Sequence, residues 1–176
     1  MKSYKLILSA LALVAALSVN TFAQETANVA VGAEVVTALT VTNAGDINLG
    51  TIQAGIASTI KAGASDAVTS EANLGVTVTY GQVTIAGALS AAVDVDFTGA
   101  TLDVSGGGSP VAFTTIAYSA EKNGGAGLFT TGSQIDLDGS GDATLDFGGT
   151  LAGAAAGTYS TALGAGSPIT VTVTYQ

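Results

Sequence analysis

The chain contains no cysteine, histidine, arginine or tryptophan, and only two prolines among its 176 residues. Without cysteine there is no disulfide bond and no thiolate that could act as a nucleophile or hold a metal. Without histidine the chain lacks the side chain that most often transfers protons near neutral pH. Carboxylates, hydroxyls and four lysines are the reactive side chains that remain, so we predict that the protein is not an enzyme.

The first 23 residues have the pattern of a secretory signal peptide. Lys2 and Lys5 carry positive charge, an apolar stretch runs from Leu6 to Val19, and Thr21 and Ala23 are small residues at the positions that a signal peptidase reads. A membrane-spanning helix needs about 20 apolar residues, so this stretch is too short for an anchor. We predict cleavage after residue 23 and no membrane span in the remaining chain. The expected location is extracellular or on the cell surface, or alternatively periplasmic.

Positive charge is nearly absent after the signal peptide. The remaining chain keeps Lys61 and Lys122 against all 13 acidic residues, which gives a formal net charge of −11. Nucleic-acid binding depends on cationic side chains that displace counterions from phosphates. We therefore expect neither nucleic acid nor an anionic membrane surface as a partner.

The remaining chain alternates apolar and polar residues, a pattern that predicts β-strands. The alternation begins with apolar residues at odd positions and continues through Leu39 and Val41. At the C-terminus it returns over residues 169–175. The apolar positions at the two ends are Ala27, Val29, Val31, Ala33 and Val35, and Ile169, Val171, Val173 and Tyr175. Shorter strands are predicted between them at Ile47–Gln53, Ser58–Ala62, Leu74–Tyr80, Gln82–Gly87, Ala92–Phe97, Thr101–Val104, Val111–Ser119, Gln134–Asp138, Ala143–Phe147 and Thr158–Leu163.

Turn-forming residues separate these segments, for example Asn43–Asp46, and the glycines at 106–108 and 148–149 are predicted to lie in hairpin loops. Strands with one polar face are typical of antiparallel sheets that are wet on one side. Numerous short strands at regular spacing predict an all-β, antiparallel, Ig-like sandwich of roughly 8–12 strands. We assign residues 24–43 to an N-terminal strand or arm and residues 44–176 to the sandwich domain.

One acidic segment, Asp136–Asp142, resembles part of a calcium-binding loop. Asp136, Asp138, Ser140 and Asp142 carry oxygen atoms at alternate positions, and Gly139 allows a sharp bend. Calcium takes six to eight oxygen ligands, and such a loop supplies several of them from one turn. The alternative is an acidic hairpin loop, because Asp and Gly are also common turn residues. The segment lacks the glutamate that closes an EF-hand loop, so both interpretations stay open.

Two groups of short motifs resemble the DUF4402 family of exported bacterial proteins. The first is Leu39-Thr40-Val41 followed by Ile47-Asn48-Leu49-Gly50-Thr51-Ile52. The second is Leu145-Asp146-Phe147-Gly148-Gly149-Thr150-Leu151, then Gly157-Thr158-Tyr159 and Val171-Thr172-Val173-Thr174-Tyr175. The resemblance spans nearly the whole exported chain. It implies export and a β-rich fold, but no activity, since the function of that family is unknown.

The C-terminal segment is also similar to that of fimbrial pilins, with Tyr175 next to last and Gly164 upstream of it. In pilins an N-terminal arm completes the Ig-like sandwich of the neighbouring subunit. The resemblance implies a structural subunit of a filament, pilus or matrix fibre. Its partner would be another copy of itself in a head-to-tail homopolymer, with or without a periplasmic chaperone or assembly platform.

The residues supply a physical reason for such exchange. An alternating segment from Gln24 to Val35, named the arm below, can add as a strand to an open sheet edge through main-chain hydrogen bonds. The donor side chains would be Ala27, Val29, Val31, Ala33 and Val35, and the acceptor edge would carry Ile169, Val171, Val173 and Tyr175. Alternatively, the arm is the first strand of its own sandwich. A second function also stays open, a monomeric secreted or surface module that binds a carbohydrate or a protein.

Overall fold

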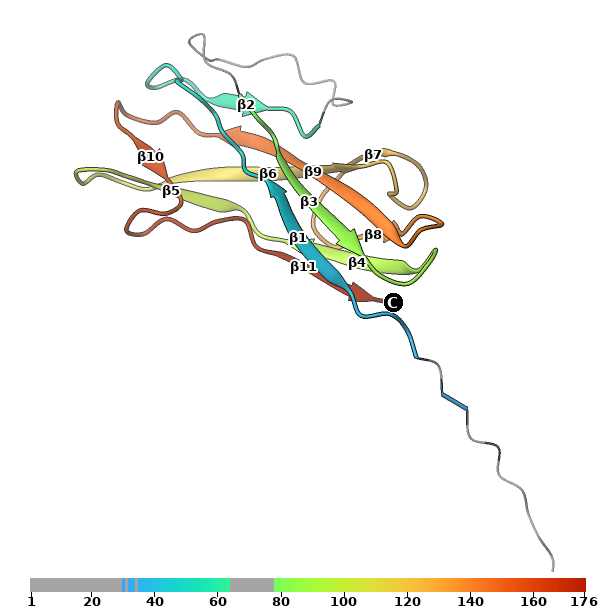
Figure 1. Cartoon of the computed structure of the whole chain (residues 1–176). Coiled ribbons are helices and arrows are strands. Elements are labelled where there is room, and N and C mark those ends of the chain that lie inside the picture. Colours follow the sequence, from blue (N-terminus) through green and yellow to red (C-terminus); the bar gives the residue numbers. More distant parts are fainter. Residues whose placement is uncertain (1–29, 31, 34, 64–77) are drawn as a thin grey trace, which may run out of the picture. The chain divides into compact units, whose positions relative to one another are not determined.

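The computed structural model describes residues 30, 32, 33, 35–63 and 78–176 of the chain (Figure 1). The chain divides into two compact units, Met1–Glu34 and Val35–Gln176. The described residues of the first unit, Ala30, Gly32 and Ala33, are exposed and outside any strand. The predicted signal peptide lies outside the described residues. No helix that could cross a membrane occurs in the part of the chain that is described.

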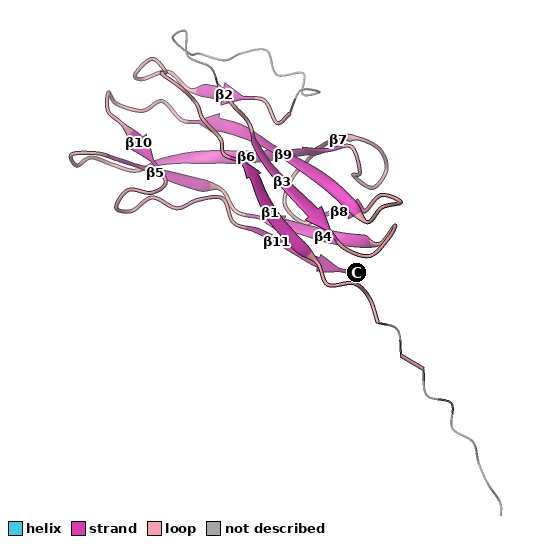
Figure 2. Ribbon diagram, in the orientation of Figure 1, coloured by secondary structure: helices cyan, strands magenta, loops and turns pink. Residues whose placement is uncertain are grey.

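The second unit consists of two antiparallel β-sheets, and no helix is present in its described residues (Figure 2). In the larger sheet the order is β1-β3-β9-β6-β5-β10, with β2 paired to β9 and β7 paired to β6. In the smaller sheet the order is β11-β4-β8. The strands of the larger sheet are β1 (Thr40–Gly45), β2 (Ser58–Ile60), β3 (Gly81–Ala86), β5 (Ala100–Val104), β6 (Val111–Ser119), β7 (Gly127–Phe129), β9 (Asp142–Leu151) and β10 (Tyr159–Ser160). Those of the smaller sheet are β4 (Ala92–Phe97), β8 (Ser133–Asp136) and β11 (Val171–Tyr175).

The main core lies between the two sheets and follows from the period-two pattern of the strands. In β4 the side chains of Val93, Val95 and Phe97 are buried, and the two aspartates between them face outward. The Phe97 ring makes edge-to-face contacts with Phe147 of the larger sheet at 5.3 Å and with Phe129 at 5.9 Å between ring centroids. The predicted all-β antiparallel sandwich is therefore confirmed.

A second, smaller core lies under one end of the larger sheet. It contains Ile60, Ala100, Phe113 and Leu151, and it is completed by apolar residues that are only partly buried. The smaller sheet contributes no strand residue to the buried members of this cluster. Loops therefore cover this end of the sandwich.

The glycines at 148 and 149 are in strand β9, so the predicted hairpin loop there is wrong. A side chain on Gly148 would collide with the backbone of residues 60–62, and one on Gly149 would collide with the Thr114 carbonyl. Glycine is required because these backbone atoms of the segments paired with β9 occupy the space that a Cβ would need. The strand is consequently longer than the predicted Ala143–Phe147.

Two further segments near β1 differ from prediction. Asn43–Gly45 belongs to β1, with a register shift between Asn43 and Gly45, where a turn was expected. The predicted strand Ile47–Gln53 is reduced to bridges, one of them between Asn48 and Thr79. The cause is local, because the Asn48 side chain accepts a hydrogen bond from Gly50 N at 2.8 Å and turns the chain there.

The remaining differences are smaller. Strand β7 was not predicted, and the predicted strand Thr158–Leu163 is shortened to β10. The predicted strand Leu74–Tyr80 falls mostly outside the described residues, and its described part, residues 78–80, makes only a bridge. The described residues from Val35 to Leu39 precede β1 without strand pairing.

Candidate functional site

The smaller sheet has one covered edge and one open edge. Beyond β8, the loop of residues 121–123 continues the pairing, since Asn123 N donates to Gln134 O at 3.0 Å and Asp136 N donates to Glu121 O at 2.9 Å. At the opposite edge, β11 pairs with β4 and with no further strand among the described residues. An open edge with free main-chain groups is a site where another strand can pair.

The hydrogen bonds at the ends of β11 fix which of its main-chain groups face the open edge. Thr98 N donates to Thr170 O at 3.1 Å, and Gln176 N donates to Ala92 O at 3.2 Å. Because antiparallel pairs alternate between bonded and non-bonded positions, even-numbered residues of β11 bond to β4. The N–H and C=O groups of Val171 and Val173 therefore point to the open edge, while their side chains pack against the core.

Strand β1 lies at the edge of the larger sheet, and its inner face is poorly covered. Val41 pairs with Ile85 and shares its face, yet Ile85 is 1% exposed and Val41 is 41% exposed. The smaller sheet ends at β11, and no strand of the described residues covers the inner face of β1. This gap between β1 and β11 is the main candidate for a functional site.

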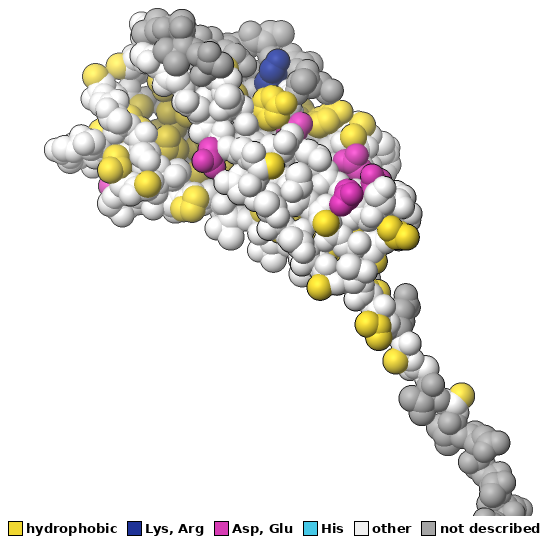
Figure 3. Space-filling model, in the orientation of Figure 1, with side chains coloured by type: hydrophobic (Ala, Val, Ile, Leu, Met, Phe, Trp, Pro, Cys, Tyr) yellow, Lys and Arg dark blue, Asp and Glu magenta, His cyan; other side chains and the backbone are white. Residues whose placement is uncertain are grey.

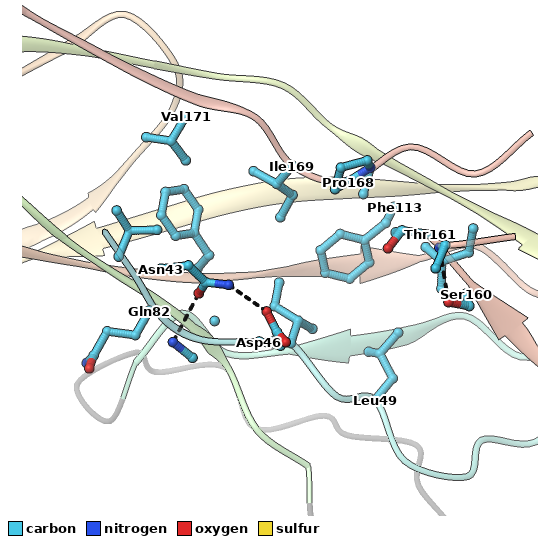
Figure 4. Close-up of a pocket in the computed structure, with 18 of the residues that line it drawn as sticks. Asn43, Asp46, Leu49, Gln82, Phe113, Ser160, Thr161, Pro168, Ile169 and Val171 are labelled. Atoms are coloured by element: carbon cyan, nitrogen blue, oxygen red, sulfur yellow. Dashed lines mark hydrogen bonds between the residues drawn. The ribbon is translucent and has the colours of Figure 1, made fainter. Parts of the chain in front are cut away.

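A groove of about 630 Å³ occupies the gap. Figure 4 shows Pro168, Ile169 and Val171 on one wall, Asn43, Asp46 and Leu49 on the other, and Phe113 between them. The lining is mainly apolar at the bottom, where the aromatic residues Phe113 and Phe147 lie. The full lining comprises residues of β1, β3, β5, β6, β9, β10 and β11 and of the loops next to β1 and β11.

Three of the polar side chains that line the groove, those of Asn43, Asp46 and Gln82, are held by hydrogen bonds. Asn43 Nδ2 donates to Asp46 Oδ1 at 2.8 Å, and Asn43 Oδ1 accepts from Gly45 N at 3.1 Å (Figure 4). Gln82 Nε2 donates to Asp146 Oδ1 at 2.9 Å. These bonds hold the bulged end of β1 in place and leave the apolar floor as the main contact surface.

The groove continues into a second hollow of about 770 Å³ between residues 47–54 and 154–161. Ile47, Leu49 and Leu102 line both spaces, so the two are adjacent. In Figure 3 apolar side chains are visible inside a hollow on the left of the view. The hollow lies over the smaller core, whose loops leave part of the apolar surface open.

Two of the four predicted acceptor residues line the groove, and the other two lie farther along β11. Ile169 and Val171 line it directly, Val173 packs against the main core, and Tyr175 lies at the end of β11. Ile169 precedes β11 and is not part of the strand. The residues of the opposite wall, above all Val41 and Asn43, were not predicted, because only the pairing of β1 with β3 brings them to the gap.

The Tyr175 hydroxyl makes two hydrogen bonds that the sequence did not indicate. It donates to Thr37 O at 2.6 Å and accepts from Ala88 N at 2.7 Å. It thereby joins β11, the β3–β4 hairpin and the segment that leads into β1. Tyr175 therefore holds the segment that precedes β1 in place at Thr37.

The predicted donor residues are only partly described. Ala27, Val29 and Val31 lie outside the described residues. Ala33 is exposed, and Val35 is 93% exposed, followed by Val36 at 50%. Donation of the arm stays a prediction.

The acidic segment 136–142 is a hydrogen-bonded hairpin loop between β8 and β9. Asp138 Oδ1 accepts from Ser140 N at 2.7 Å and from Asp142 N at 2.9 Å, and these bonds lower the pKa of the Asp138 carboxyl. Asp136 Oδ1 accepts from Gln134 Nε2 at 3.0 Å. Within the described residues, no three acidic side chains are grouped so that they could hold a metal ion. The bonds favour the hairpin interpretation, and calcium binding stays a prediction.

The resemblance to the DUF4402 family also stays a prediction. No protein-family model, no curated protein and no solved structure matches this chain.

Proposed function

We propose that the protein is a structural subunit of an extracellular filament, pilus or matrix fibre, and that it assembles by donating the arm to the groove of a neighbouring copy. The observation that carries the proposal is the open edge of β11 beside the uncovered inner face of β1. One added strand would pair with the free groups of Val171 and Val173 and would cover Val41.

The arm has the features that such a strand needs. From Ala27 its odd positions carry small apolar side chains, and its even positions carry mostly polar ones. Small side chains suit a groove whose floor already holds two phenylalanine rings. Because the donating arm and the accepting groove are different surfaces, the contact is head-to-tail and extends into a filament.

The proposal also accounts for the export signal and the charge. Assembly outside the cytoplasm requires a signal peptide, which residues 1–23 resemble. A net charge of −11 in the exported chain opposes nonspecific aggregation, so association depends on a specific contact. We propose no enzyme activity for this protein, because the polar side chains of the groove are two amides, two hydroxyls and one carboxylate, and the chain has no imidazole or thiol to act with them.

The test compares residues 24–176 with a variant that begins at Val36. We expect the longer chain to form polymers in light scattering and filaments of uniform width in negative-stain microscopy, and the shorter chain to remain monomeric. A matched pair of arm variants provides the control. Val29→Ser with Val31→Ser should reduce polymerisation, whereas Asn28→Ser with Ala30→Ser should not. A stable, soluble monomer of residues 24–176 at micromolar concentration would refute the proposal.

The groove itself favours one second candidate, a monomeric binding module for a carbohydrate or a protein segment. Its volume falls in the range of about 300–1,000 Å³ that small-molecule sites occupy, and its mouth has amide and hydroxyl groups. A glycan array with the variant beginning at Val36, whose groove is free of any arm, tests this function. Binding that Val41→Asp abolishes would support it, and an array without hits would not.

A further inference from the structure

The Tyr175 hydroxyl holds together three segments that are far apart in the sequence. It accepts from Ala88 N and donates to Thr37 O, while its own ring packs against the main core. Gly87 leaves room for this arrangement, since a Cβ there would lie 2.6 Å from the Tyr175 hydroxyl and 2.8 Å from the Leu39 side chain. The hydroxyl is therefore closely surrounded by these residues, near the C-terminal end of the arm.

This position lies at one end of the groove. Val41, Asn43 and Gly45 of β1 line the groove, whereas Leu39, Thr37 and Tyr175 do not. From Thr37 the chain enters β1 and runs along the groove wall. To enter its own groove, the arm would have to reverse direction at or before Thr37.

The sequence at this point opposes a reversal. Residues 33–42 contain no glycine, proline, asparagine or aspartate, and Val35-Val36-Thr37 are all β-branched. A tight two-residue reversal of a strand needs positive φ at one or both central residues, which β-branched residues rarely adopt. The nearest glycine before Thr37 is Gly32, inside the arm itself. A chain with Thr37 held by Tyr175 therefore leaves the groove in an extended conformation.

We infer that the hydrogen bonds of Tyr175 to Thr37 and Ala88, named the clasp below, prevent the arm from entering the groove of its own chain. The groove thereby stays open for the arm of a second copy. This inference rests on the proposed function, and it adds a positioning residue that selects exchange between subunits over closure within one subunit. Without the clasp, residues 36–39 become free to form a wider loop, so the arm can insert into the groove of its own chain. This insertion competes with donation to a second copy, because it loses no translational freedom.

The test uses the absence of cysteine from the natural chain. In residues 24–176, Ala33→Cys is combined with Thr172→Cys, an exposed position on β11, and the two are joined by a short bismaleimide. With Tyr175 present, we expect crosslinks between chains, seen as a ladder on a denaturing gel. With Tyr175→Phe added, we expect the ratio of within-chain to between-chain crosslinks to rise by about tenfold, since two hydrogen bonds at the clasp are lost.

Tyr118→Phe is the matched control, because Tyr118 lies on β6, away from the groove, and its hydroxyl makes no hydrogen bond to another described residue. We expect its crosslink ratio to equal that of the parent. A second variant, with Asn-Gly inserted between Val36 and Thr37, supplies the missing turn and should form within-chain crosslinks even when Tyr175 is present.

The results separate the clasp from the proposed function. If the parent forms a ladder and Tyr175→Phe forms the same ladder, the clasp is refuted and strand donation stands. A fall in melting temperature of Tyr175→Phe without a change in the crosslink ratio also refutes the clasp, since a merely structural role predicts that result. If the parent forms no ladder, strand donation is refuted. In that case, more within-chain crosslinks in Tyr175→Phe than in the parent would support the clasp. An equal amount in the two proteins would refute it.

Discussion

Val41→Thr is expected to weaken assembly while leaving the stability of the single subunit nearly unchanged. Val41 lies on the inner face of β1 and is 41% exposed, because no strand in the described part of the chain covers it. Threonine has nearly the same shape and a similar preference for strands. In the single subunit its hydroxyl would still reach water, so the free energy of unfolding should change by no more than about 0.5 kcal/mol.

Assembly would remove that hydroxyl from water. Full burial of a valine side chain contributes about 1.5–3 kcal/mol, so covering the exposed part of Val41 contributes about 1 kcal/mol. Burying an unpaired hydroxyl in the same place costs about 1 kcal/mol or more. Threonine keeps one of the two valine methyl groups, so only about half of the burial contribution is lost. With the cost of the hydroxyl, the loss amounts to about 1.5 kcal/mol, which corresponds to an assembly constant about tenfold weaker.

Two measurements separate the effects. The critical concentration for polymerisation of residues 24–176 reports on assembly, and urea unfolding of the variant that begins at Val36 reports on the subunit. Thr42→Val, on the opposite face of β1, is the matched control and should change neither. An unchanged critical concentration for Val41→Thr would show that the groove is not the assembly site. A loss of subunit stability equal to the loss in assembly would refute the argument from exposure.

Three further predictions follow from single sites. Ser119 is fully buried, and its hydroxyl contacts Glu121 and the Thr144 carbonyl, so Ser119→Ala should lower the free energy of unfolding by about 1–3 kcal/mol in urea, whereas the more exposed Ser133→Ala should have little effect. The pKa of Asp138 is lowered from its ordinary value of 3.8, so its contribution to stability is present above pH 3.8 and is lost as the pH falls below it. Asp138→Ala should therefore flatten the acid end of a plot of stability against pH, and an unchanged slope would contradict this. Millimolar calcium should leave the melting temperature unchanged, since the backbone already occupies Asp138 Oδ1, and a clear increase that Asp138→Ala abolishes would instead establish the calcium site.

The core-facing positions of several strands could be predicted from the sequence because alternation is a local property of an extended chain. The predicted ranges Ala92–Phe97 and Val111–Ser119 are those of β4 and β6, and the buried valines of β4 are the apolar positions of the pattern. Prediction failed where a neighbouring segment determined the backbone. The glycines at 148 and 149 resemble a loop, but close contact with residues 60–62 and Thr114 keeps them in β9.

The candidate site could be predicted in part. The apolar face of residues 169–175 follows from alternation, and two of its residues, Ile169 and Val171, line the groove. The other wall could not be predicted, because Val41 and Asn43 reach the gap through pairing with residues about 40 positions away. The hydrogen bonds of Tyr175 to Thr37 and Ala88 likewise join segments that are far apart in the sequence, and no local pattern predicts that these segments lie close together.

The sequence by itself determined that this chain is β-structured, strongly acidic and without thiol or imidazole chemistry, since these properties depend only on composition and on the two-residue period. The tertiary structure decided which edges are open. Among the residues that the structure describes, β8 is covered by residues 121–123, whereas β11 and the inner face of β1 are not covered. This difference depends on strand order. Strand order arises from long-range packing between sheets, so the groove and the clasp beside it became visible only in the folded chain.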